Sequence, residues 1–193
     1  MNRVPKNYSR RARVATGGAV LAVVALAGFG AVSANASAPA TTSAATTSAA
    51  ASVSAPARAT ITSTHLTIDA ATKAAQAALD AAEKENQRVT VAVVDRGGNT
   101  IVTLRGDGAG PQSYESAERK AFTAVAWNAP TSQLVERLEQ SPNLKDIPGT
   151  LFLAGGVPVA ADKAPIAGIG VAGAPSGALD ERFAQAGANA IAR

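Results

Sequence analysis

The fold is decided by Val89–Leu104, which reads VTVAVVDRGGNTIVTL. The β-branched run at its start, Val89–Val94, predicts a buried strand. The paired glycines within 95–99 permit positive φ angles, which predicts a hairpin turn there. Residues 100–104 then return as the partner strand, so the stretch predicts an antiparallel sheet.

Helical patterns lie on both sides of this hairpin. Residues 66–87 have alanine, the best helix former, at many positions, and Thr67 is suited to cap the first turn. The other predicted helices cover 112–127, 132–139 and 179–192, and the other predicted strands cover 151–154, 157–160 and 165–171. Because the connections between strands are as short as hairpin turns, we expect an α/β (α+β) fold with a five-stranded antiparallel sheet flanked by helices.

The first 36 residues predict a twin-arginine export signal. Arg10 and Arg11 precede an apolar run over 19–32, and Ala34-Asn35-Ala36 offers small residues for cleavage. A retained membrane anchor is the alternative, although the apolar stretch is shorter than the roughly 20 residues of a spanning helix. We therefore expect a secreted protein that is either released or held at the cell surface.

The rest of the chain divides into a linker and a domain. Residues 37–63 are rich in Ala, Ser, Thr and Pro and predict a flexible linker, and residues 64–193 suit one domain. Removing the export signal takes away five basic residues and no acidic ones, so the formal net charge falls from +4 to −1. A basic surface for nucleic acid is therefore not expected.

Common catalytic machinery is missing from the sequence. The chain has no cysteine, one histidine, no Gly-x-Ser-x-Gly motif and no phosphate loop ending in Gly-Lys-Ser or Gly-Lys-Thr. A hydrolytic triad and a multi-histidine zinc site therefore cannot form within one chain, which favours ligand binding over hydrolysis. The single histidine, His65, is either an exposed residue at the junction of linker and helix or an axial ligand of haem iron.

Two acidic pairs have a spacing that brings carboxylates together on a helix. Asp80 and Glu83 lie three positions apart in the first predicted helix, as do Glu115 and Glu118 in the second. Each pair can chelate a metal ion through its oxygens. Each pair also has a basic residue four positions after its first carboxylate, which makes an ordinary ion pair the alternative.

Several short motifs together resemble the GlcG/HbpS family. Each is weakly specific alone, whereas the ordered set is specific and extends over residues 66–193. The motifs are VVDRGGN at 93–99, AERKAFTA at 117–124, GGVP at 155–158, GIGVAG at 168–173 and Asp180 at the start of the final helix. The export signal, the linker and the run GPQSYE at 110–115 make the resemblance closest to the secreted haem-binding branch of that family.

This resemblance implies a profilin-like α/β sandwich that assembles as an octamer. It also implies binding of haem, degradation of haem, uptake of the released iron, and association with a membrane sensor histidine kinase. The two-component system of that kinase responds to haem and to oxidative stress.

The resemblance also implies particular site residues. A threonine is associated with haem coordination in this branch, which implies Thr123; a helix threonine bonded back to a carbonyl is the alternative. An acidic pair with two residues between its members binds iron there, and both pairs named above fit. We expect a secreted, oligomeric haem- and iron-binding accessory sensor. The alternatives are a haem-degrading enzyme and a metal-free binding module with the glycine-rich loop at 105–110 as one wall.

Overall fold

The structure, a computed structural model, describes residues 52–192. The predicted export signal at 1–36 and the first part of the predicted linker lie outside the described residues. The chain from Val53 onward forms one compact unit. None of the helices formed by residues 52–192 has the length and apolar character of a membrane-spanning helix.

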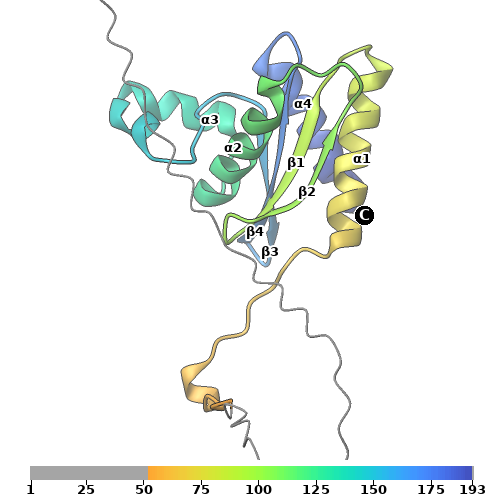
Figure 1. The fold of residues 1–193 in the computed structure, drawn as a ribbon. Helices are drawn as coiled ribbons and strands as arrows, with labels where there is room; N and C mark the ends of the chain where they lie inside the picture. Colours follow the sequence, from red (N-terminus) through yellow and green to blue (C-terminus); the bar gives the residue numbers. More distant parts are fainter. Residues whose placement is uncertain (1–51, 193) are drawn as a thin grey trace, which may run out of the picture. The chain divides into compact units, whose positions relative to one another are not determined.

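Four antiparallel strands form the sheet, in the order β2-β1-β4-β3 (Figure 1). Their bounds are β1 Thr90–Asp95, β2 Thr100–Arg105, β3 Gly156–Ala161 and β4 Ala164–Ala172. The predicted hairpin between β1 and β2 is confirmed: the Asp95 amide donates to the Asn99 carbonyl at 2.8 Å, and Gly98 has φ +88°. The turn between β3 and β4 uses positive φ at Asp162 and Lys163. Turn chemistry that is local in sequence therefore sets both hairpins.

The fifth predicted strand, Leu151–Ala154, does not form. Its first amide donates instead to the Thr123 hydroxyl at 2.8 Å, and the Leu153 amide donates to the Leu151 carbonyl at 3.0 Å. Phe152 is buried against Trp127, with their ring centroids 5.3 Å apart. The segment therefore satisfies its polar backbone locally and serves as a packed connection rather than as a strand.

Helices cover both faces of the sheet (Figure 1). α1 (Ile68–Lys84) and α4 (Gly177–Ile191) pack together on one face, and α2 (Gln112–Trp127) packs on the other. The short α3 (Thr131–Glu136) lies beyond α2, and the 3₁₀ helices η2 (Arg137–Glu139) and η3 (Pro142–Asp146) follow it. The predicted Thr67 cap on α1 is confirmed, because its hydroxyl accepts from the Ala70 amide at 3.2 Å.

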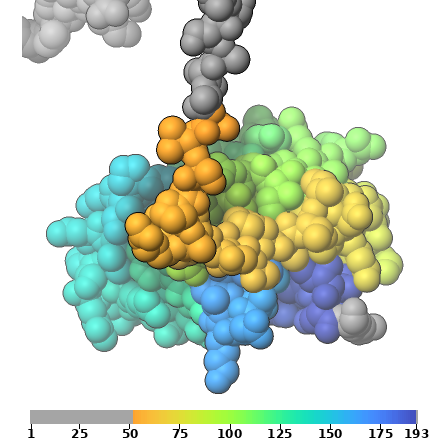
Figure 2. All heavy atoms as spheres, turned by 90° about the horizontal axis from the view of Figure 1, so that it is seen from below, coloured from red at the N-terminus to blue at the C-terminus, as the bar shows by residue number. Residues whose placement is uncertain are grey.

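Residues before α1 project from the domain. They include the 3₁₀ helix η1 (Ala57–Ala59), and the side chains of residues 52–65 are exposed. Figure 2 shows the face from which they emerge, with the early part of α1 on one side and the α3 region on the other.

The main core lies between the sheet and the α1–α4 layer and is built mostly from small side chains. Alanines of α1 meet valines of β1 and β4 around the fully buried Phe183. On the opposite face, glycines in the strands replace side chains beneath α2. A Cβ added at Gly170 would lie 2.5 Å from the Ala121 amide nitrogen. The helix therefore rests almost directly on the backbone of β4, which holds its outer face in a fixed position beside the β1–β2 hairpin.

Candidate functional site

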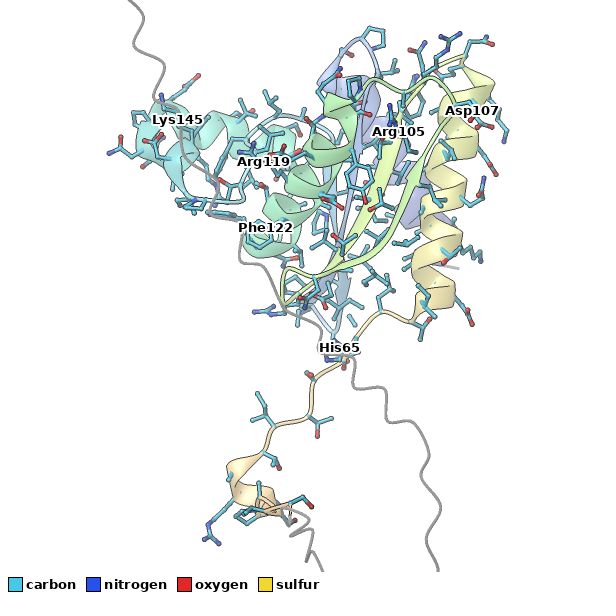
Figure 3. All side chains as sticks on the ribbon, in the orientation of Figure 1. His65, Arg105, Asp107, Arg119, Phe122 and Lys145 are labelled. Atoms are coloured by element: carbon cyan, nitrogen blue, oxygen red, sulfur yellow. The ribbon has the colours of Figure 1, made fainter. Side chains whose placement is uncertain are left out.

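A hollow of about 260 Å³ lies where α2 meets the β1–β2 hairpin and the connection after η3. We call it the Phe122 hollow. Its polar and apolar lining residues are Val94, Gly98, Thr100, Glu118, Arg119, Phe122 and Gly149. Figure 3 shows Arg119 and Phe122 on α2, on the far side of the sheet from α1. Three segments distant in sequence therefore build one surface.

Phe122 is half-buried and lies between two glycines with positive φ. A Cβ added at Gly98, which has φ +88°, would lie 2.9 Å from the ring, and one added at Gly149 would lie 3.6 Å from it. The hairpin turn can thus approach the ring closely only because position 98 has no side chain. The ring is held against the backbone and supplies a flat apolar surface to the hollow.

Of the predicted pair Glu115 and Glu118, Glu118 lines this hollow, and Glu115 lies beside its lining residue Arg119. The Glu118 carboxylate accepts hydrogen bonds from the hydroxyls of Thr100 at 3.4 Å and Thr103 at 3.3 Å. The Glu115 side chain is 77% exposed, and its carboxylate lies 3.6 Å from the Arg119 guanidinium. The alternative ion pair is thus present, and both carboxylates still have free acceptor positions. No group of three or more possible metal ligands occurs among residues 52–192, so one chain offers two carboxylates at this place.

Two hydrogen bonds fasten the connection after η3 to α2. The Arg119 guanidinium donates to the Thr150 carbonyl at 2.6 Å, and the Leu151 amide donates to the Thr123 hydroxyl at 2.8 Å. Thr123 is fully buried, and its hydroxyl donates to the Arg119 carbonyl at 2.7 Å. The structure therefore shows the alternative given for Thr123, which is a helix threonine that hydrogen-bonds back to a carbonyl. Its role as an iron ligand stays a prediction.

The other predicted residues lie away from this hollow. Asp80 and Glu83 are exposed on α1, on the opposite face of the sheet from α2. Asp80 accepts a hydrogen bond from Gln76 at 2.7 Å, and it makes no ion pair with Lys84. His65 is exposed where the chain enters α1, and its ring contacts the Ser63 hydroxyl at 2.7 Å (Figure 3). The structure brings neither the α1 pair nor His65 together with Glu115 and Glu118.

A buried ion pair behind the hollow was not foreseen from the sequence. The ammonium of Lys120 on α2 lies 2.7 Å from the Asp180 carboxylate on α4 and donates to the Val171 carbonyl at 3.0 Å. Only 4% of Lys120 and 3% of Asp180 are exposed. Burial raises the pKa of Asp180, and the hydrogen bond and charge of Lys120 oppose that rise. The sequence signal for this ion pair was a lysine at a helix position that faces the core, because a buried charge needs a partner.

Glu181, next to Asp180, connects α4 to α3. Its carboxylate accepts from the Ser132 amide at 2.9 Å, the Ser132 hydroxyl at 2.5 Å and the Gly155 amide at 3.2 Å. The first turn of α4 thus fixes α2, α3 and the start of β3 through two adjacent carboxylates. The motifs around Lys120, Gly155 and Asp180 therefore form the frame that positions α2.

The residues of this frame lie within a segment that matches a known protein family. The model of the family described as haem degrading protein HbpS-like matches residues 66–189. The chain belongs to the HbpS-like family. The matched segment contains the sheet, nearly all of the helical layers and every residue of the Phe122 hollow.

Relatives of known structure extend this result. The chain is 72% identical to Streptomyces reticuli HbpS, crystallised as a variant in which two glutamates three positions apart are aspartates; the match has a TM-score of 0.72 and covers 73% of this chain and 97% of that one. It is 27% identical to PduOC, solved in complex with haem, with a TM-score of 0.61 and coverage of 66% and 95%. It is also 32% identical over 113 residues to an uncharacterised 15.0 kDa protein of Citrobacter freundii, covering 56% of this chain and 80% of that protein. The HbpS-like fold, with its antiparallel sheet flanked by helices, is thus confirmed with four strands in place of five.

Proposed function

We propose that this HbpS-like protein binds haem and that the Phe122 hollow receives part of the porphyrin face. The observation that carries the proposal is the haem complex of PduOC, a relative with the same fold. The hollow supplies the expected chemistry, because Phe122 and Val94 give apolar surface for a flat ring system. When bound, haem would bring a redox-active iron to this surface.

The size of the hollow indicates that one chain covers only part of the ligand. Its volume of about 260 Å³ is below the roughly 300–1,000 Å³ typical of pockets that enclose small molecules. A second copy of the chain would provide the remaining surface, in agreement with the expected octamer. Exposed apolar side chains around the hollow's elements support such an assembly; they are Tyr114, Val135, Ile147 and Leu153.

Thr123 and His65 remain the proposed haem ligands. The Thr123 hydroxyl already donates to Arg119 and accepts from Leu151, so binding to iron would require the connection at Leu151 to move. A ligand with that cost would hold haem weakly and reversibly, which suits a sensor. His65 is exposed and needs no rearrangement of the core, but it does not line the Phe122 hollow, so it would reach haem there from a second copy of the chain.

We further propose that Glu115 and Glu118 bind iron, with Asp80 and Glu83 as the alternative pair. The Streptomyces reticuli variant supports the first pair, because it too concerns two glutamates three positions apart. Two carboxylates fill only part of the coordination sphere of a metal ion, so water or a second copy of the chain would supply the remaining ligands. Secretion through the signal at 1–36 and signalling of haem and oxidative stress to a membrane sensor histidine kinase complete the proposal.

Absorbance-monitored haem titration tests the central proposal. The wild-type protein should give a saturable Soret band, and an unchanged haem spectrum would contradict haem binding. Thr123→Val removes the hydroxyl while keeping the side-chain shape, and Thr123→Ser keeps the hydroxyl as the matched control. A band that shifts in the valine variant and persists in the serine variant supports Thr123 as ligand. A shift caused only by His65→Ala assigns the role to His65.

Haem degradation is the second candidate function, favoured by the description of the matched family. Incubation of the haem-loaded protein with a reductant or with peroxide distinguishes the two. Repeated turnover with release of iron and of an opened porphyrin indicates an enzyme. Bleaching of one haem per binding site indicates a sensor or scavenger.

A further inference from the structure

We propose that Arg119 binds a carboxylate of the ligand in the Phe122 hollow, and that Glu115 competes with the ligand for the same guanidinium. For haem, the carboxylates are the two propionates at one edge of the porphyrin. The inference deepens the proposed function and rests on it. It adds a residue that determines which porphyrins bind and in which orientation.

The hydrogen-bonding state of Arg119 carries the proposal. A guanidinium has five N–H donors. In the described part of the chain, Arg119 uses its side chain for one hydrogen bond, from Nη2 to the Thr150 carbonyl at 2.6 Å. The Nη1 atom lies 3.6 Å from the Glu115 carboxylate, which is too far for a hydrogen bond. The side chain is 40% exposed, so donors remain available to a ligand.

The bond to Thr150 also fixes the guanidinium at the rim of the hollow. A long side chain that is already held loses less rotamer entropy when it binds a ligand. Arginine recognises carboxylates well because its planar fork donates two parallel hydrogen bonds. Arg119 therefore has the properties of a prepared anion-binding residue, beside the ring that would contact the porphyrin face.

The charges around the hollow set the orientation of the ligand. Arg119 is the single basic residue among the described residues that line the hollow. Glu118 is the single acidic one, and hydroxyls of Thr100 and Thr103 hold its carboxylate on the β2 side. A propionate beside Glu118 would be repelled, so the carboxylate edge of the porphyrin should face Arg119.

A metal ion at the proposed Glu115–Glu118 site would couple to this recognition. A cation bound between Glu115 and Glu118 would take the Glu115 carboxylate away from Arg119 and leave the guanidinium without a counter-charge. A ligand carboxylate would then bind Arg119 more tightly. Because coupling between two sites is reciprocal, haem should tighten metal binding by the same factor.

Haem and haem dimethyl ester, in which the propionates carry no charge, form the test. Both are titrated into the wild-type protein, followed by absorbance and by the fluorescence of Trp127, the single tryptophan of the chain. Arg119→Gln should weaken haem about tenfold and leave the ester unchanged, because a charge-assisted hydrogen bond contributes about one factor of ten or more. Arg182→Gln is the matched control, since it removes an exposed arginine that pairs with Glu85 away from the hollow.

Each outcome decides between the proposals. Equal affinity of the wild-type protein for haem and ester overturns the role of Arg119 while haem binding stands. An equal loss of affinity for haem and for the ester in Arg119→Gln also overturns this role, because the residue would then act through Thr150 on the shape of the hollow. Failure of both porphyrins to bind the wild-type protein overturns the proposed function and this inference with it. Glu115→Gln should bind haem about twofold more tightly than wild type, because an exposed ion pair between residues four apart on a helix contributes only a few tenths of a kcal/mol, and a weaker binding would contradict the competition.

Discussion

Replacing Gly170 with alanine is expected to separate α2 from the sheet. The new Cβ would lie 2.5 Å from the Ala121 amide nitrogen and closer still to the Ala117 carbonyl oxygen. Ordinary contact begins near 3.4 Å, so the helix backbone must retreat by about 0.9 Å or more. Both obstacles are backbone atoms of a regular helix and cannot rotate away. Overpacking usually costs about 1–3 kcal/mol, and moving the whole helix places this substitution at or above the upper end.

Urea unfolding followed by far-ultraviolet circular dichroism measures this cost. We expect the free energy of unfolding to fall by about 3 kcal/mol or more. Gly97→Ala is the control, because its Cβ would meet only the side chains of Asn99 and Asp95, at 3.1 and 3.2 Å. Those groups can adjust, so the control should lose less than about 1 kcal/mol. A loss in Gly170→Ala no larger than in the control would refute the idea that β4 glycines set the position of α2.

Three further predictions concern the frame, the hairpin and the hollow. Lys120→Met should lower the free energy of unfolding by about 3 kcal/mol or more, because Asp180 is left buried without its counter-charge. Since burial raises the pKa of Asp180, the folded state of this variant should lose further stability as pH rises through that pKa. Urea unfolding at several pH values checks both expectations, and a loss under about 1 kcal/mol on substitution would contradict the first. Burial also tends to raise the pKa of Asp95, but hydrogen bonds from Asn99 outweigh it and leave the pKa below its ordinary value. Asp95→Asn should therefore cost about 0.5–1 kcal/mol at pH 7, and the difference from wild type should shrink as pH falls below about 4; a pH-independent difference would count against this reading. Phe122→Ala should weaken haem binding by about tenfold in the same absorbance titration, and an unchanged affinity would remove the hollow from the proposed site.

The hairpins and long helices could be predicted because their determinants are local. The positive φ of Gly98 and the β-branched residues on either side of the turn are sufficient for β1 and β2. Thr67 marks the start of α1 through one hydrogen bond to a residue three positions away. In each case the residues that decide the structure are neighbours in sequence, so tertiary context had little to alter.

The segment 151–154 shows where this reasoning fails. Its apolar residues have the composition of a strand, but none of the four strands of the sheet pairs with them. Thr123, 28 residues earlier in the chain, takes the first amide of the segment. Phe152 is buried against Trp127 rather than on the sheet. A strand needs a partner as well as a pattern, and the partner is a property of the fold.

The candidate site was predicted only in part for the same reason. The spacing of Glu115 and Glu118 indicates a shared helix face, and the structure confirms that both lie on α2, where Glu118 lines the hollow and Glu115 lies 3.6 Å from Arg119. Nothing local indicates that Gly98 and Gly149 would enclose Phe122, because they come from segments 51 residues apart. The importance of Arg119 likewise depends on Thr150, which sequence alone does not place beside α2.

The arrangement of α2 explains why binding residues collect on its outer face. Its inner face meets glycines of β4, and Lys120 anchors it to α4 through a buried ion pair. A helix held this closely has little freedom to shift when a ligand binds. The connection after η3 is held to α2 by hydrogen bonds to Arg119 and to Thr123, the residue proposed to reach iron, and by the packing of Phe152 on Trp127. Binding of iron to Thr123 would therefore loosen this connection before it disturbs the helix, whereas a ligand carboxylate on the unused donors of Arg119 would leave the bond to Thr150 in place.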